Sequence, residues 1–131
     1  MILGLGTDAC AIKRFEKILE NPRFLERWFT AAERDYLAGR RAESAAGLFA
    51  AKEAASKALG SGFSHFGPDS VEILHDAQGR PRCRLHGAAL ERLEALGGAE
   101  ILVSITHDGG LALAVALAVS AEPAAKVPRQ E

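Results

Sequence analysis

The sequence predicts an α+β fold in which a long central helix packs on a small antiparallel sheet. Helical patterns fill the first half of the chain and hairpin patterns the second, an order typical of α+β proteins. An alanine-rich stretch from about residue 44 to residue 59 contains no proline and is therefore the longest predicted helix. The 131 residues suit one domain with its own core, which we place at residues 1–121.

The first element is predicted as a buried strand. The run Ile2–Asp8 is apolar until its last two residues, which places Asp8 at the end of this strand. Apolar residues at positions 12, 15 and 19 recur at helical spacing and predict a helix after it. Asn21 and Pro22 interrupt that helix and begin a short second one through Trp28.

Two further helices follow before the sheet is completed. Residues Thr30–Glu33 have the form of a capping box, so a third helix runs from about residue 31 toward Gly39. The long helix over residues 44–59 is bounded by Gly60, and its wall of small residues indicates that it is packed on much of its circumference. Residues 60–69 contain three glycines and a proline and predict a loop.

The second half predicts two hairpins with a short helix between them. Strands at residues 71–74 and 82–85 pair across a turn at residues 76–79. The helix spans residues 88–96, with Leu90, Leu93 and Leu96 facing inward. A second hairpin pairs residues 101–106 with residues 111–119 across a turn at residues 107–110. The tail, residues 122–131, contains two prolines and mixed charge and is predicted to be disordered.

Composition and charge favour a cytoplasmic protein without a nucleic-acid or membrane partner. The formal net charge of -1 gives no overall attraction to polyanions. Cys10 and Cys83 lie far apart and lack metal-type spacing, which fits a reducing compartment. The apolar run at residues 111–119 is too short to cross a bilayer, and the first residues lack the basic flank of a signal peptide.

Three charged side chains are candidates for metal-assisted chemistry. Glu53 and Lys57 lie four residues apart, so they share one face of the long helix, as in a common surface ion pair. Asp8 either caps a helix or joins Glu53 in holding Mg²⁺. This ion binds one or two carboxylates, keeps several waters and completes its shell with substrate phosphate oxygens. Mn²⁺ fits the same oxygen ligands.

Two further groups of polar residues have competing interpretations. Thr106 and His107 cannot both face one site if a strand continues through them, because side chains alternate along a strand. His107 is either a turn residue or a member of a site. The basic residues of the first helices form a solvated, salt-bridged face or dock an acidic protein. These basic residues are Lys13, Arg14, Lys17, Arg23 and Arg27.

Four segments in register resemble the bacterial holo-[acyl-carrier-protein] synthase family. They are Gly4–Asp8, Phe29–Glu33, Phe49–Gly60 and Ser104–Asp108, and their order and spacing match the family up to about Val119. The resemblance implies the 4′-phosphopantetheinyl transferase fold and a role in fatty acid biosynthesis. The implied reaction transfers phosphopantetheine from coenzyme A to a serine of apo acyl carrier protein and releases adenosine 3′,5′-bisphosphate.

The resemblance also implies roles for individual residues. Asp8 and Glu53 hold Mg²⁺ and, with Lys57, form the catalytic set. Coenzyme A contacts Lys57, His107 and Thr106. An acidic helix of the carrier protein is received by basic residues of the first helices, here Lys13, Arg14, Arg23 and Arg27. The implied assembly is a homotrimer with active sites at subunit interfaces.

One position departs from the family pattern. The family commonly has arginine immediately before the phenylalanine of the long helix, whereas this chain has Leu48 before Phe49. A charge expected near the phosphates of coenzyme A is therefore missing. Arg40 or Arg41 is the candidate to supply part of it. We therefore expect Leu48 to affect the affinity of the protein for its donor, coenzyme A.

The hypothesis for the mechanism has the carrier serine attack the phosphorus that bears pantetheine. Lys57 offsets charge on the leaving diphosphate, and either Glu53 or a metal-bound water that Glu53 orients takes the serine proton. Two other classes of function remain open. One is a trimeric binding module without activity, in which Glu53 and Lys57 form a structural ion pair. The other is a Mg²⁺-dependent phosphoesterase that uses the same carboxylates.

Overall fold

The computed structural model describes residues 1–121, and the tail predicted to be disordered lies outside the described residues. The strands are β1 (Ile2–Ala11), β2 (Val71–His75), β3 (Pro81–Leu85), β4 (Gly98–Asp108) and β5 (Leu111–Ser120). The helices are α1 (Arg14–Ile18), α2 (Pro22–Trp28), α3 (Ala31–Leu37), α4 (Ala42–Ala58) and α5 (Gly87–Ala95). Short 3₁₀ turns at Gly62–Ser64 and Pro68–Ser70 lead into β2. The predicted α+β class is confirmed.

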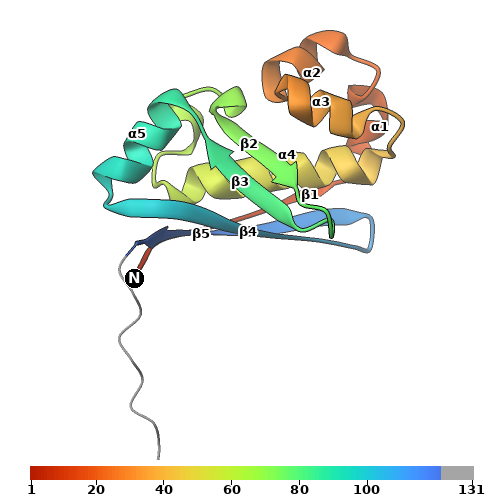
Figure 1. Ribbon diagram of the computed structural model, residues 1–131. Coiled ribbons are helices and arrows are strands. Elements are labelled where there is room, and N and C mark those ends of the chain that lie inside the picture. Colours follow the sequence, from red (N-terminus) through yellow and green to blue (C-terminus); the bar gives the residue numbers. More distant parts are fainter. Residues whose placement is uncertain (122–131) are drawn as a thin grey trace, which may run out of the picture.

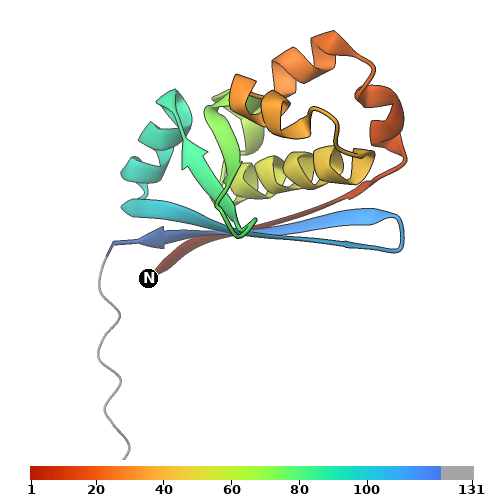
Figure 2. The same ribbon diagram turned by 45° about the vertical axis from the view of Figure 1, so that its right-hand side comes forward.

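A three-stranded antiparallel sheet, in the order β1-β5-β4, forms one layer of the molecule. The long helix α4 crosses one face of this sheet, and the other helices and the β2–β3 hairpin lie on the same side (Figure 1). The view turned by 45° shows the same layers (Figure 2). Within residues 1–121, no helix or strand covers the opposite face of the sheet.

Small residues allow α4 to lie close to the sheet. Every second residue of β5 from position 112 to position 118 is a buried alanine, and most buried residues of α4 are alanine. Gly4 and Gly6 of β1 bring the strand against the helix backbone: a Cβ at either would lie 1.9 Å from a carbonyl oxygen of α4. The predicted packing of this helix on most of its circumference is confirmed.

Aromatic side chains join the N-terminal half of α4 to the first helices. The ring of Phe49 lies 5.2 Å from that of Phe15, 4.7 Å from that of Trp28 and 6.4 Å from that of Phe24. The predicted capping box at the start of α3 is confirmed, because Thr30 and Glu33 exchange both bonds. Among the helices of residues 1–121, none combines the length and the hydropathy needed to cross a bilayer.

The first strand differs from its prediction in two ways. It continues to Ala11, so Asp8 lies within β1 rather than at its end, and α1 begins only at Arg14. The strand is also not buried, since Leu5 is 62% exposed. The reason is that only one face of β1 meets α4.

Two predictions for the second half were also wrong in detail. Strand β4 runs through His107 to Asp108, and the turn is only Gly109 and Gly110, both with positive φ, as in tight two-residue hairpins. In α5, Ala89 and Leu93 form the buried stripe while Leu90 is 39% exposed. Leu90 lies one residue from Ala89 and therefore about 100° around the helix from it.

Candidate active site

Asp8 and Lys57 meet at the edge of the sheet. Lys57 Nζ on α4 lies 3.3 Å from Asp8 Oδ1 on β1 and donates a hydrogen bond to Thr7 O at 3.0 Å. Asp8 is largely covered, with 17% of its side chain exposed, whereas the Lys57 side chain is 51% exposed. Lys57 therefore pairs with Asp8 rather than with Glu53. The interpretation of Glu53 and Lys57 as an ordinary surface ion pair of one helix is wrong. Asp8 is also no helix cap, because Lys13 precedes α1.

Glu53 lies one helical turn before Lys57 and is affected by the charge of Asp8. Burial raises the pKa of Glu53, and the nearby negative charge of Asp8 raises it further, against the opposing charges of Lys57 and Arg14. The structure thus brings two carboxylates from separate elements into electrostatic contact. Such a pair is stabilised by a cation that both oxygen groups can share.

The donor set fits Mg²⁺ better than a metal held entirely by protein. Within residues 1–121 there is no cluster of three or more His, Cys, Asp or Glu side chains able to hold a metal ion. Asp8 and Glu53 supply two carboxylates, which suits an ion that retains waters and recruits phosphate oxygens. A closed tetrahedral zinc site requires four ligands.

A cavity of about 510 Å³ opens beside Asp8. Its lining includes Lys57 from α4 and Thr106 from β4, on either side of the central strand β5. The lining residues are Thr7, Asp8, Ala9, Lys57, Ser104, Thr106, Leu113, Ala114 and Val115. Three of the predicted site residues, Asp8, Lys57 and Thr106, therefore share one cavity.

His107 and Arg40 lie elsewhere within this chain. His107 Nε2 is 2.9 Å from the carbonyl oxygen of Glu43, and the ring lines a separate cavity with Tyr36 and His75. The rings of Tyr36 and His75 stack at 4.1 Å, and the guanidinium of Arg40 lies 3.9 Å from the Tyr36 ring centroid. The expected alternation of Thr106 and His107 is confirmed, because each lines a different cavity.

The predicted carrier-binding residues lie along the first helical region. Lys13 and Arg14 stand at the start of α1, and Arg23 and Arg27 lie on α2; all four are exposed. Among residues 1–121, none of the four forms a salt bridge, so they are not a salt-bridged face. Arg14 lies 5.4 Å from the centroid of Phe49 and acts electrostatically on Glu53, which links this basic region to the carboxylates.

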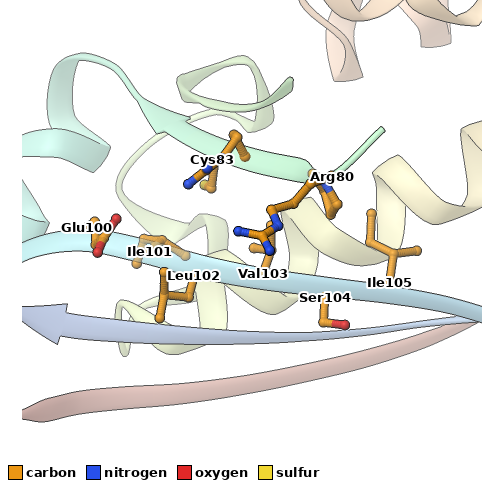
Figure 3. A pocket seen from close by; sticks show the side chains of 10 residues that line it. Arg80, Cys83, Glu100, Ile101, Leu102, Val103, Ser104 and Ile105 are labelled. Carbon is orange, nitrogen blue, oxygen red and sulfur yellow. The ribbon is translucent and has the colours of Figure 1, made fainter. Parts of the chain in front are cut away.

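Arg80, which the sequence analysis did not single out, lines a third cavity. This residue follows the turn of the β2–β3 hairpin, and its side chain extends toward β4 beside this cavity of about 340 Å³ (Figure 3). The neighbouring residues Gly79 and Pro81 line the His107 cavity. The sequence shows a basic residue next to a hairpin glycine, but only the packing of the hairpin against β4 places this side chain in a cavity with Val103 and Ile105.

The arrangement resembles known proteins in both sequence and structure. The model of the 4′-phosphopantetheinyl transferase superfamily matches residues 4–116. A holo-[acyl-carrier-protein] synthase of Solidesulfovibrio magneticus is 50% identical over 118 residues, covering 88% of this chain and 96% of that protein. The corresponding protein of Treponema denticola is 42% identical over 120 residues, covering 89% of this chain and 98% of that protein.

Solved structures show the same fold. The holo-[acyl-carrier-protein] synthase of Helicobacter pylori in complex with coenzyme A aligns with a TM-score of 0.77 at 31% identity, covering 87% of this chain and 98% of that chain. A Bacillus anthracis holo-(acyl-carrier-protein) synthase in complex with CoA (3′,5′-ADP) aligns with a TM-score of 0.76 at 32% identity, covering 92% and 99%.

Proposed function

The chain belongs to the holo-[acyl-carrier-protein] synthases of the 4′-phosphopantetheinyl transferase superfamily, and from this membership we propose a Mg²⁺-dependent transfer reaction. The donor is coenzyme A, and the acceptor is a serine of apo acyl carrier protein. The products are the holo carrier protein and adenosine 3′,5′-bisphosphate. Family membership removes the two alternatives, a binding module without activity and a phosphoesterase.

The observation that carries the proposal is the ion pair of Asp8 with Lys57, one helical turn after Glu53, whose pKa is raised by burial and by the charge of Asp8. The two carboxylates come from β1 and α4, and Lys57 Nζ lies 3.3 Å from Asp8. Asp8 and Glu53 would hold Mg²⁺, which supplies charge neutralisation for a diphosphate when bound. Lys57 adds a mobile positive charge at the mouth of the same cavity.

The chemistry assigned to the chain's own residues is positioning and proton transfer. The serine oxygen attacks the phosphorus that bears pantetheine, and the bond from that phosphorus to the oxygen of the departing adenosine bisphosphate breaks. Glu53, or a water that it orients, accepts the serine proton. Burial and the charge of Asp8 raise the pKa of Glu53, which makes this carboxylate a stronger base. Lys57 donates to the departing phosphate, where negative charge accumulates.

The positions of the residues expected to bind coenzyme A support a site shared between subunits. Lys57 and Thr106 line one cavity, whereas His107 lines another together with Tyr36, and the Arg40 guanidinium lies over the Tyr36 ring. If His107 and Arg40 of a neighbouring subunit lay beside the cavity that holds Lys57 and Thr106 of this subunit, the two subunits together would complete the coenzyme A site. The uncovered face of the sheet supports a homotrimer, because it exposes large apolar side chains. These are Leu5, Leu102, Leu111, Leu113 and Val115.

The basic residues of the first helices support docking of the carrier protein. Lys13, Arg14, Arg23 and Arg27 are exposed and free of salt bridges within residues 1–121. Such a surface accelerates association with an acidic partner. Arg14 also lies near Glu53, so a carrier helix on this surface would bring its serine toward the carboxylates.

The cysteines support a cytoplasmic location, and the family match over residues 4–116 supports one transferase domain over residues 1–121. Cys10 and Cys83 are both free, as is usual in a reducing compartment. Burial raises the pKa of Cys10 to about 11, with a further contribution from Asp8, and burial raises that of Cys83 to about 12. Both thiols are therefore protonated at neutral pH and take no part in the reaction.

Intact-mass spectrometry of an apo acyl carrier protein tests the proposal. The carrier is incubated with this protein, coenzyme A and either Mg²⁺ or a chelator. We expect a gain of one phosphopantetheine group with Mg²⁺, none with the chelator and none with the Asp8→Ala variant. Asp35→Ala, an exposed aspartate on α3, is the matched control and should retain activity. Full transfer by Asp8→Ala or in the chelator would refute the metal assignment.

A further inference from the structure

A fully buried ion pair anchors the middle of α4. Lys52 and Glu33 have side chains with 0% exposure, and Lys52 Nζ lies 2.6 Å from Glu33 Oε1 and 2.6 Å from Val71 O. Glu33 also accepts hydrogen bonds from Thr30 N at 2.8 Å and Ile73 N at 3.0 Å. The pair thus connects α4 to the start of α3 and to β2. Both carboxylate oxygens of Glu33 accept hydrogen bonds, and Lys52 donates two.

The opposite side of α4 offers little to fix the position of the helix. There α4 meets buried alanines of β5 and the backbone at Gly4 and Gly6. Helices are usually held in register by large side chains that interlock with those of their neighbours, and alanine methyl groups provide only shallow ridges. Between Ala50 and Ala58, Lys52 is the only long buried side chain of α4.

A buried ion pair is weak evidence for stability. Removing two charges from water costs much of what their attraction returns, and apolar replacements are often equally stable. The best-attested use of such groups is to select one register among similar packings. An alanine and glycine interface is one for which shifted packings would otherwise differ little in energy.

The location of the Lys52–Glu33 pair links the axial position of α4 to the position of Glu53 in the proposed metal site. Glu53 directly follows Lys52, so a shift of α4 by one residue along its axis would move Glu53 by about 1.5 Å relative to β1. Productive geometry at catalytic sites is held to within about 0.5 Å. The separation of Glu53 from Asp8 therefore depends on the axial position of α4.

We propose that the Lys52–Glu33 pair fixes the axial position of α4 over its small-residue interface and thereby sets the separation of Glu53 from Asp8. Lys52 and Glu33 are positioning residues, since they lie in the core and act through Glu53. The second half of this inference rests on the proposed metal site, whereas the first half concerns the helix alone.

The test uses the full chain and a neutral double variant, Lys52→Met with Glu33→Gln. Changing one partner alone would leave a buried charge without its counter-ion and could prevent folding, whereas the double variant leaves none. Mn²⁺ binding by electron paramagnetic resonance reports the carboxylate geometry. Hydrogen exchange of residues 50–58, measured without metal, reports the motion of α4.

The control is Leu93→Ala, which creates a cavity beneath α5 and leaves α4 unchanged. We expect the double variant to bind Mn²⁺ about tenfold more weakly, as is typical when support for a ligand is lost, and to exchange faster in α4 than the control. Wild-type values for both quantities would overturn the inference. If the wild type itself does not bind Mn²⁺, the proposed metal site is wrong, and the exchange comparison alone decides the role of the pair.

Discussion

Glu72 shows how a single carboxylate is held in its charged form at the end of the buried network. Burial alone would raise the pKa of Glu72. The hydrogen bonds from Thr30 Oγ1 at 2.5 Å and from His86 Nε2 at 3.2 Å, with the charges of His86 and Arg84, outweigh this effect and lower the pKa below its ordinary value of 4.5. The folded protein therefore prefers ionised Glu72 more strongly than the unfolded chain does.

This preference predicts a pH-dependent effect of Glu72→Gln. Because the folded pKa is lowered, the stabilisation from Glu72 is complete above about pH 4.5 and is lost as the pH falls below it. We expect the variant to be less stable than the wild type by about 1–2 kcal/mol at pH 7. The difference should shrink as the pH falls below 4.5. Urea unfolding across this range measures it, with Glu94→Gln on α5 as control. A difference independent of pH would contradict the prediction.

The contact between β1 and α4 is the element-level feature on which the site depends. Asp8 lies on the strand and Glu53 and Lys57 on the helix, so their approach requires that the two backbones lie close together. Gly6 makes this approach possible, because a Cβ there would lie 1.9 Å from Ala54 O. A neighbouring backbone carbonyl cannot move aside as the end of a flexible side chain can.

Gly6→Ala should therefore displace the helix from the strand. We expect a loss of at least about 3 kcal/mol in the free energy of unfolding, at the upper end of overpacking effects. Equilibrium urea denaturation provides the measurement. Ala11→Ser, at an exposed position of the same strand, should change stability by less than about 0.5 kcal/mol. Similar values for the two variants would show that the strand and helix are less tightly apposed than the structure describes.

At the scale of the whole molecule, the uncovered face of the sheet is the main feature that one subunit leaves unexplained. The sheet exposes several large apolar side chains, of which Leu5 is 62% exposed and Leu102 is 45% exposed. Association through this face would bury these side chains.

A charge on this face should separate the subunits. We expect Leu5→Glu to reduce the mass in solution from that of a trimer to that of a monomer, measured by analytical ultracentrifugation, and to abolish transfer because the donor site would be incomplete. Leu90→Glu, on the exposed side of α5 and 39% exposed in the wild type, should remain trimeric and active. A wild-type monomer with full activity would refute both the assembly and the shared site.

The local sequence by itself predicted the helices, and the resemblance to the family named the candidate site residues. The alanine content of α4, the capping box at Thr30 and Glu33 and the glycine-containing hairpin turn each act within a few residues, so they could be predicted without a structure. The family segments identified Asp8, Glu53 and Lys57, and the structure places them together.

Only the tertiary structure decided how the charged residues pair and which faces are open. Lys57 pairs with Asp8, which is 49 residues away, although Glu53 is its helical neighbour. Lys52 and Glu33 are 19 residues apart and pair inside the core. Leu5 is exposed because its side chain lies on the face of the sheet opposite α4, where Leu113 and Val115 of the central strand β5 are exposed as well. These outcomes depend on packing between elements distant in sequence, and local composition and spacing do not specify that packing.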